Sequence, residues 1–223
     1  PPLCQPPGCS GVGTWTKGAL DFATDIIVET QADHPGDLEP GDERWYGLMV
    51  ITDGAWTDQV GFPQLFPPEQ NPAISAANLF DNLDVPTYVV AVAEAANLEF
   101  ANELAEAGGT GEAIGAENPQ AVVDAVGGII EEIKDAVIIP ECIEGLPRLM
   151  VILDASSSML DVGDMHGMMG ETGWDKAREA LAGVGDDSLF QVPVPEVGED
   201  KVLEDLVHLG MIVFGSPGEE KVS

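Results

Sequence analysis

The sequence predicts an α/β fold in which a mostly parallel central sheet is covered by helices on both faces. Continuous apolar segments at 45–52, 87–93 and 148–153 are typical of strands that are buried on both sides. Segments with an apolar residue at every third or fourth position alternate with them, as in helices that pack on such a sheet. In this architecture ligands bind at the carboxyl ends of the strands, so the residues that follow each apolar segment are the first candidates for function.

Five helices are predicted from apolar periodicity and from end signals. Proline stands at the first position of the segments 72–83 and 119–136, and a glycine pair follows the segment 98–107. The other two helices are expected at 13–30 and 173–183, a further strand at 206–214, and a short edge strand at 112–115. The residues expected to be buried by the first helix are Leu20, Ala23, Ile27 and Val28.

The charge of the chain is strongly acidic and excludes some classes of partner. Forty acidic residues against eight Lys and Arg give a formal net charge of −32. Such a field repels phosphate backbones and anionic lipids, so neither nucleic-acid binding nor membrane docking is expected. It attracts cations, although general acidity also serves solubility. With 223 residues, 44% of them hydrophobic, the chain suffices for one packed α/β domain or for two incomplete ones.

The cysteines and the lack of long apolar runs bear on the compartment. Cys4 and Cys9 lie in the segment CQPPGC, for which a disulfide is a simpler explanation than a metal site made of two cysteines. Cys142 is the odd one and either stays free or pairs outside this sequence. No apolar run approaches the ~20 residues of a membrane span, and no signal peptide is visible. We expect a secreted or cell-surface protein, of bacterial origin, without insertion into the membrane.

A cluster of oxygen-bearing side chains follows the strand at 148–153. Asp154, Ser156 and Ser158 form a D-x-S-x-S pattern in the loop directly after that strand. One carboxylate and two hydroxyls are hard ligands that suit Mg²⁺, Ca²⁺ or Mn²⁺ better than zinc or copper. The same residue types are also common in turns and helix N-caps, so the pattern alone is open to both interpretations.

Two other segments carry further oxygen ligands. Asp53 follows the strand at 45–52 in the pattern T-D-G, and Thr14 precedes the first helix in the pattern T-x-T-x-G-A. Together with D-x-S-x-S, these segments resemble the metal-ion-dependent adhesion site of the von Willebrand factor A (vWA) family. The resemblance implies a Rossmann-like vWA fold that binds Mg²⁺ or Ca²⁺, or Mn²⁺ in their place, with an open position for a partner's carboxylate. The metal-site residues that it implies are Asp154, Ser156, Ser158, Thr14 and Asp53.

The order of these segments departs from the family pattern, in which D-x-S-x-S comes first. Residues 1–137 resemble the C-terminal half of a vWA domain, 138–147 a linker, and 148–223 the N-terminal half. This order fits a circular permutant that closes on itself, a segment that straddles two tandem domains, or halves that complete each other between chains. The roughly 11 residues at 137–147 reach at most ~35 Å, which is enough to join the two halves within one domain.

Other residues near these segments have less specific interpretations. Trp56 and Trp15 are candidates for a partner-binding rim, with core packing an equal alternative for Trp56. The acidic loop at 161–171 favours a solvated segment over a second cation site. His208 falls within a predicted strand and is expected to have a structural role.

These observations favour divalent-cation-dependent protein binding, or adhesion, over catalysis. The expected partner is a protein that presents an Asp or Glu carboxylate to the cation. The first alternative is a structural surface or filament subunit, assembled head-to-tail by exchange of half-domains. A metal-dependent hydrolase is a weaker alternative, because the sequence contains no nucleophile elbow, phosphate-cradling glycine loop or His-paired Cys. We therefore expect that the protein is not an enzyme.

Overall fold

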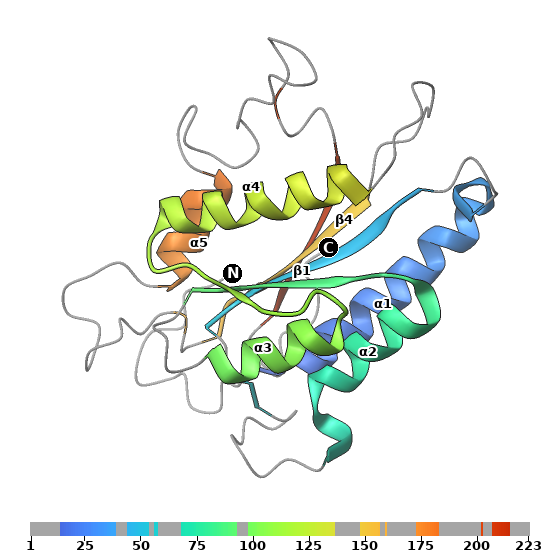
Figure 1. The fold of residues 1–223 in the computed structure, drawn as a ribbon. Helices are drawn as coiled ribbons and strands as arrows, with labels where there is room; N and C mark the ends of the chain where they lie inside the picture. Colours follow the sequence, from blue (N-terminus) through green and yellow to red (C-terminus); the bar gives the residue numbers. More distant parts are fainter. Residues whose placement is uncertain are drawn as a thin grey trace.

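A five-stranded parallel β-sheet forms the centre of the molecule (Figure 1). The computed structural model of the chain describes residues 14–38, 44–53, 56–57, 68–92, 98–136, 148–156, 159, 173–182, 202 and 207–214, apart from the side chains of 131 and 134–136. Every pairing between neighbouring strands is parallel, and the strand order is β3-β2-β1-β4-β5. The strands are β1 (Tyr46–Thr52), β2 (Thr87–Ala91), β3 (Ile114–Gly115), β4 (Arg148–Asp154) and β5 (His208–Phe214). The predicted α/β class with a parallel sheet is therefore confirmed.

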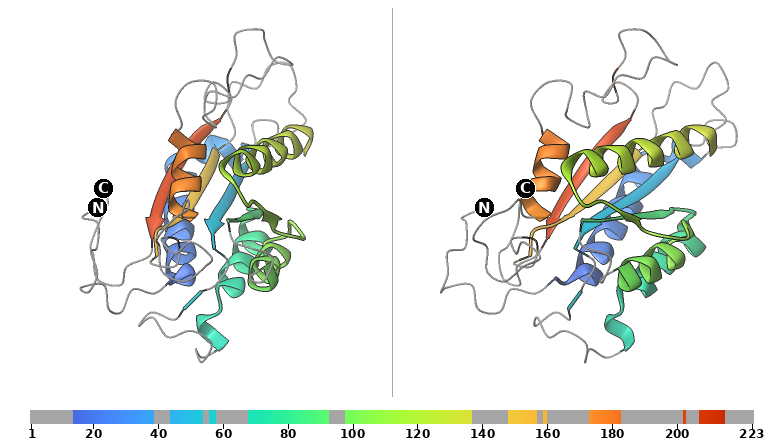
Figure 2. Two further views of the ribbon diagram at one scale, coloured as in Figure 1. Left: turned by 90° about the vertical axis from the view of Figure 1, so that its left-hand side faces the viewer. Right: turned by 60° about the vertical axis from the view of Figure 1, so that its left-hand side comes forward.

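Helices cover both faces of this sheet (Figure 2). One face carries α1 (Thr16–Asp33), α2 (Pro72–Leu83) and α3 (Leu98–Ala107). The other face carries α4 (Pro119–Ala136) and α5 (Gly173–Ala182). Two short 3-10 helices, η1 (Pro35–Leu38) and η2 (Pro68–Gln70), complete the described elements. None of the helices in the described part of the chain is both long and apolar enough to cross a membrane.

Successive strand residues contribute to two separate cores, because side chains alternate between the faces of a sheet. Met49 and Ile51 of β1 pack in the core beneath α4 and α5, whereas Leu48 and Val50 pack in the core beneath α1, α2 and α3. All seven residues of β1 are buried. This continuous burial explains the unbroken apolar run in the sequence, since a strand covered on both faces has no solvent side.

β1 and β4 join the two halves of the chain in the middle of the sheet. Their register runs from Tyr46 opposite Arg148 to Ile51 opposite Leu153. From β1 the chain continues outward to β2 and β3, and from β4 it continues outward to β5 in the opposite direction. The strand order therefore reverses between β1 and β4, and such a switch point is where open parallel sheets bind ligands. One copy of the chain supplies all five strands of this sheet.

The predicted elements agree closely with the observed ones. The bounds of α2, α3 and α4 are as predicted, whereas α1 begins at Thr16 and ends at Asp33. The predicted burial of Val28 is wrong, because 47% of this residue is exposed. A helix turns by about 100° per residue, which carries Val28 away from the buried face that Leu20 and Ile27 share.

Several predicted features lie outside the described residues. These are the linker at 138–147, the acidic loop at 161–171, Cys4, Cys9, Cys142 and Ser158.

Candidate metal centre

The carboxyl edge of the sheet brings two of the predicted site segments into direct contact. Thr52 ends β1 and Asp154 ends β4, and these strands are hydrogen-bonded neighbours. The Oγ1 hydroxyl of Thr52 donates to Oδ2 of Asp154 over 2.9 Å, although 102 residues separate the two in the sequence. The T-D-G and D-x-S-x-S segments therefore meet at the switch point between β1 and β4.

Hydrogen bonds fix the loop that carries Asp154 and Ser156. The backbone N–H of Ser156 donates to Oδ1 of Asp154 over 2.8 Å, a turn that Asp side chains favour. The N–H of Ala155 donates to the carbonyl of Phe214, at the end of β5, over 2.6 Å. The N–H of Met159 donates to the carbonyl of Ser156 over 3.2 Å, and its side chain is buried beneath α4 and α5. The loop is therefore anchored on both sides of Ser156.

Asp154 shares this edge with a second carboxylate. Asp154 is fully buried, and Asp53, the residue directly after β1, is close enough to act on it electrostatically. Burial, and then the negative charge of Asp53, raise the pKa of Asp154 to about 7. Hydrogen bonds from Ser156 and Thr52 stabilise the charged form and act in the opposite direction. A bound cation would favour the charged form further, because it would offset both burial and repulsion.

The threonine loop reaches the same edge through backbone hydrogen bonds. The carbonyl of Thr14 accepts from the N–H of Thr57 over 2.8 Å and from the N–H of Thr16 over 2.9 Å. Because Thr57 follows Asp53 closely in the sequence, the first of these bonds ties Thr14 to the segment that leaves β1. Both Thr14 and Thr16 are buried. The predicted residues Thr14, Asp53, Asp154 and Ser156 therefore belong to one connected set of segments.

A glycine in the first turn of α1 allows Trp15 to fold back over the start of the helix. A Cβ atom added to Gly18 would lie 2.4 Å from Cε3 of the Trp15 indole, which is closer than side chains pack. Trp15 itself is half-buried. Since Trp15 follows Thr14 directly, the glycine of the T-x-T-x-G pattern helps to hold the threonine loop in place.

Trp56 packs in the core beneath α3, which corrects the prediction of a partner-binding rim at this residue. Only 6% of Trp56 is exposed, and its ring meets that of Phe100 edge-on, with the centroids 5.0 Å apart. The core-packing alternative is the one that the structure supports. The apolar indole finds a better environment between helices than at the edge, where acidic and hydroxyl groups gather. The half-buried Trp15 stays a prediction for the rim.

Two residues support the site although the sequence patterns assigned no role to them. Thr52 holds one carboxyl oxygen of Asp154, and Met159 anchors the serine loop in the core. The signal for Thr52 was its place at the carboxyl end of a buried strand, directly before Asp53. Nothing local distinguishes Met159 from the methionines that follow it.

Carboxylates do not cluster further in the described part of the chain, where no group of three or more His, Cys, Asp or Glu side chains is placed to hold a metal ion. The predicted ligand set is of another kind, since it combines two carboxylates with three hydroxyls.

Comparison of the chain with protein-family models, with curated proteins and with solved structures gives no match. Function is therefore inferred from the geometry of this edge.

Gly18→Ala should destabilise the protein, although alanine favours helix formation by about 1 kcal/mol over glycine. The added methyl group must displace the Trp15 ring, at an expected cost of about 1–3 kcal/mol. Gly128→Ala is the matched control, because an added Cβ there meets nothing within 4 Å in the middle of α4. Urea unfolding should show a loss of stability for the first variant and a gain for the second. Equal gains in both would contradict the packing role of Gly18.

Asp154→Asn should change how stability depends on pH. The pKa of Asp154 is about 7 in the folded state against an ordinary value of 3.8, so the folded state holds the proton more tightly. The resulting stabilisation is complete below pH 3.8 and is lost as the pH rises towards 7. This difference corresponds to about 4 kcal/mol, since each pKa unit is worth about 1.36 kcal/mol.

The measurement is the free energy of unfolding of the wild type and of Asp154→Asn between pH 4 and 8 in EDTA. Relative to the wild type, the variant should become more stable by up to about 4 kcal/mol as the pH rises, because its Asn side chain carries no charge at any pH. Asp124→Asn, at an exposed position on α4, should show no such trend. Parallel pH profiles for the wild type and Asp154→Asn would contradict this prediction, because they would mean that folding does not raise the pKa of Asp154.

Proposed function

We propose that this protein binds a carboxylate of a partner protein through a divalent cation held at the carboxyl edge of its sheet. The observation that carries this proposal is the hydrogen bond from Thr52 to Asp154. It brings the T-D-G and D-x-S-x-S segments together at the switch point, where the resemblance to the vWA family requires them to be.

The residues that would hold the cation are Asp154, Ser156, Ser158, Thr14 and Asp53. Mg²⁺ and Ca²⁺ are the expected ions and Mn²⁺ a substitute, because all five side chains offer hard oxygen atoms. Three of these ligands are neutral hydroxyls, which leave the cation enough positive charge to attract another carboxylate. When bound, the cation would supply that attraction, while the protein fixes its position.

The electrostatics of the edge supports a bound cation. Asp154 and Asp53 are acidic groups in mutual repulsion, one of them fully buried, and a cation between or beside them would relieve that repulsion. The net charge of −32 raises the local concentration of cations around the whole chain. The same net charge repels an anionic ligand, and a cation held at this edge would offset that repulsion locally.

The sheet topology supports a closed, permuted domain over an assembly made by exchange of half-domains. β1 from the first half and β4 from the second are paired neighbours within one chain. Head-to-tail exchange would replace this pairing with an identical one between copies, at the additional entropic cost of association. We therefore propose a single-chain binding module as the working unit. The segment CQPPGC supports a secreted or cell-surface location, because a disulfide there would need oxidising surroundings.

The first test is direct cation binding. Titration of EDTA-treated wild-type protein with Mg²⁺ or Ca²⁺ in a calorimeter, in 0.15 M KCl to screen diffuse attraction, should show one saturable site. Asp154→Asn and Ser156→Ala should each weaken the site by roughly tenfold or more. Asp124→Asn changes the net charge by the same amount as Asp154→Asn and should leave the affinity unchanged. Equal weakening by the two aspartate variants would mean that only diffuse charge attracts the cation.

The second test is capture of a carboxylate by the bound cation. With Mn²⁺ at the site, N-acetylglutamate α-amide should displace a metal-bound water and lower the relaxation rate of the water protons. N-acetylglutamine α-amide has the same shape without the charge and should have no effect. If the two compounds act alike, or if the glutamate compound acts equally on the Asp154→Asn protein, the adhesion proposal fails even where the cation binds.

A further inference from the structure

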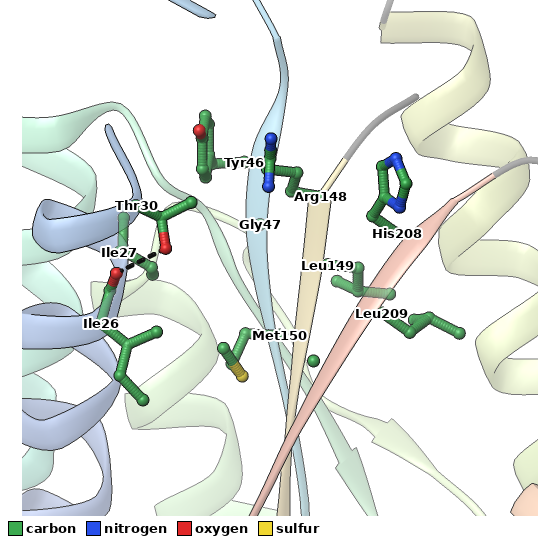
Figure 3. A pocket seen from close by; sticks show the side chains of 11 residues that line it. Ile26, Ile27, Thr30, Tyr46, Gly47, Arg148, Leu149, Met150, His208 and Leu209 are labelled. Carbon is green, nitrogen blue, oxygen red and sulfur yellow. Dashed lines mark hydrogen bonds between the residues drawn. The ribbon is translucent and has the colours of Figure 1, made fainter. Parts of the chain in front are cut away.

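A pocket of about 210 Å³ lies at the amino edge of the sheet (Figure 3). The candidate metal centre lies at the opposite, carboxyl edge. The pocket opens between the C-terminal half of α1 and the starts of β1, β4 and β5. β4 runs from Arg148 at this pocket to Asp154 at the other edge, a separation of about 20 Å at ~3.3 Å per residue. The pocket is therefore separate from the site proposed for the cation.

Strand register aligns three polar side chains in a row across this pocket. Tyr46 of β1 is opposite Arg148 of β4, which in turn is opposite His208 of β5. The guanidinium carbon of Arg148 lies 5.9 Å from the centre of the Tyr46 ring, a cation–π contact. Tyr46 belongs to the core beneath α1, so this contact holds the guanidinium on the α1 side of the sheet. His208 is exposed at the start of the edge strand, which differs from the structural role expected for it.

The rest of the wall is largely apolar. Ile26 and Ile27 face the pocket from α1, and Met150 faces it from β4. The hydroxyl of Thr30 donates to the carbonyl of Ile26 over 2.7 Å, so it is not available as a donor to a ligand. Gly210 leaves room for Met150, because a Cβ atom there would lie 2.8 Å from the Met150 methyl carbon. The pocket thus has a basic end and an apolar wall.

Basic groups are scarce in this protein, which makes their presence in one pocket informative. The chain has eight Lys and Arg and three His residues against forty acids. A guanidinium carries five N–H donors in a planar fork that matches a carboxylate, and an imidazole adds another donor. A cavity of about 150 Å³ suffices for benzene, and drug-sized ligands occupy roughly 300–1,000 Å³, so the occupant is small.

We propose that this pocket binds a small organic carboxylate. The carboxylate group would lie against Arg148 and His208, and an aromatic or short aliphatic body would lie between α1 and Met150. This site is independent of the cation, since none of its lining residues belongs to the proposed metal centre.

The experiment uses benzoate as the probe and benzamide as its uncharged equivalent. The reporter is the NMR signal of the Met150 methyl group in protein labelled with [¹³C-methyl]methionine, recorded with EDTA and again with Mg²⁺. Benzoate should shift this signal in a saturable manner in both conditions. Benzamide should bind at least roughly tenfold more weakly, because it lacks the charged oxygens that strengthen hydrogen bonds from a guanidinium; tenfold corresponds to about 1.4 kcal/mol.

Two threonines of α1 provide a matched pair of variants. Thr30 and Thr24 are both half-buried, and each hydroxyl donates to the carbonyl four residues earlier. Only Thr30 lines the pocket. Thr30→Leu should fill the pocket and abolish benzoate binding, whereas Thr24→Leu should leave it unchanged. His208→Gln, at an exposed position, should weaken binding of benzoate and leave that of benzamide unaltered.

Three results would overturn the proposal. Equal affinities for benzoate and benzamide would show an apolar cavity without anion recognition. Equal loss of binding in Thr24→Leu and Thr30→Leu would show that the signal reports on the helix and not on the pocket. A Met150 signal that does not saturate up to the solubility limit of benzoate would show that the pocket binds no such ligand.

Discussion

The parallel pairing of β1 with β4 is the constraint on which the rest of the structure depends. These strands form the centre of the sheet, are covered by helices on both faces, and come from parts of the chain about one hundred residues apart. Their register places Thr52 beside Asp154 at one edge and Tyr46 beside Arg148 at the other. A shift by one residue would turn each side chain of β4 to the opposite face of the sheet. Both pairs would then be separated, and the residues that β4 contributes to one core would enter the other.

The polarity of the parallel sheet separates its chemistry between two edges. The interior of β4 is apolar, because it lies between two cores, so charged groups occur only at its ends, with Arg148 at the start and Asp154 at the finish. All strands point the same way, which collects the acidic and hydroxyl groups that follow β1 and β4 at the carboxyl edge. The amino edge collects the aromatic and basic groups that open β1, β4 and β5.

The electrostatics of the carboxyl edge oppose folding when no cation is present. A fully buried Asp154 close to Asp53 is a poor arrangement for stability, because burial and repulsion both oppose its negative charge. The fold nevertheless holds this side chain in one orientation, through Thr52 on one oxygen and the Ser156 N–H on the other. This electrostatic cost and this fixed geometry support the proposal of a cation at the carboxyl edge, because a positive ion would offset both burial and repulsion.

The sequence by itself determined which segments become helices and strands, because apolar periodicity, proline at helix starts and glycine at helix ends are local signals. The bounds of α2, α3 and α4 follow from them directly. It also identified Asp53, Asp154 and Ser156 as candidates, since polar residues directly after buried strands stand where parallel sheets bind ligands.

Only the tertiary structure decided that β4 pairs with β1 of the same chain, that Thr52 holds Asp154, and that Trp56 packs on Phe100. The basic pocket likewise arises from register between three strands. Each of these features depends on contacts between residues distant in the chain, which no local pattern encodes.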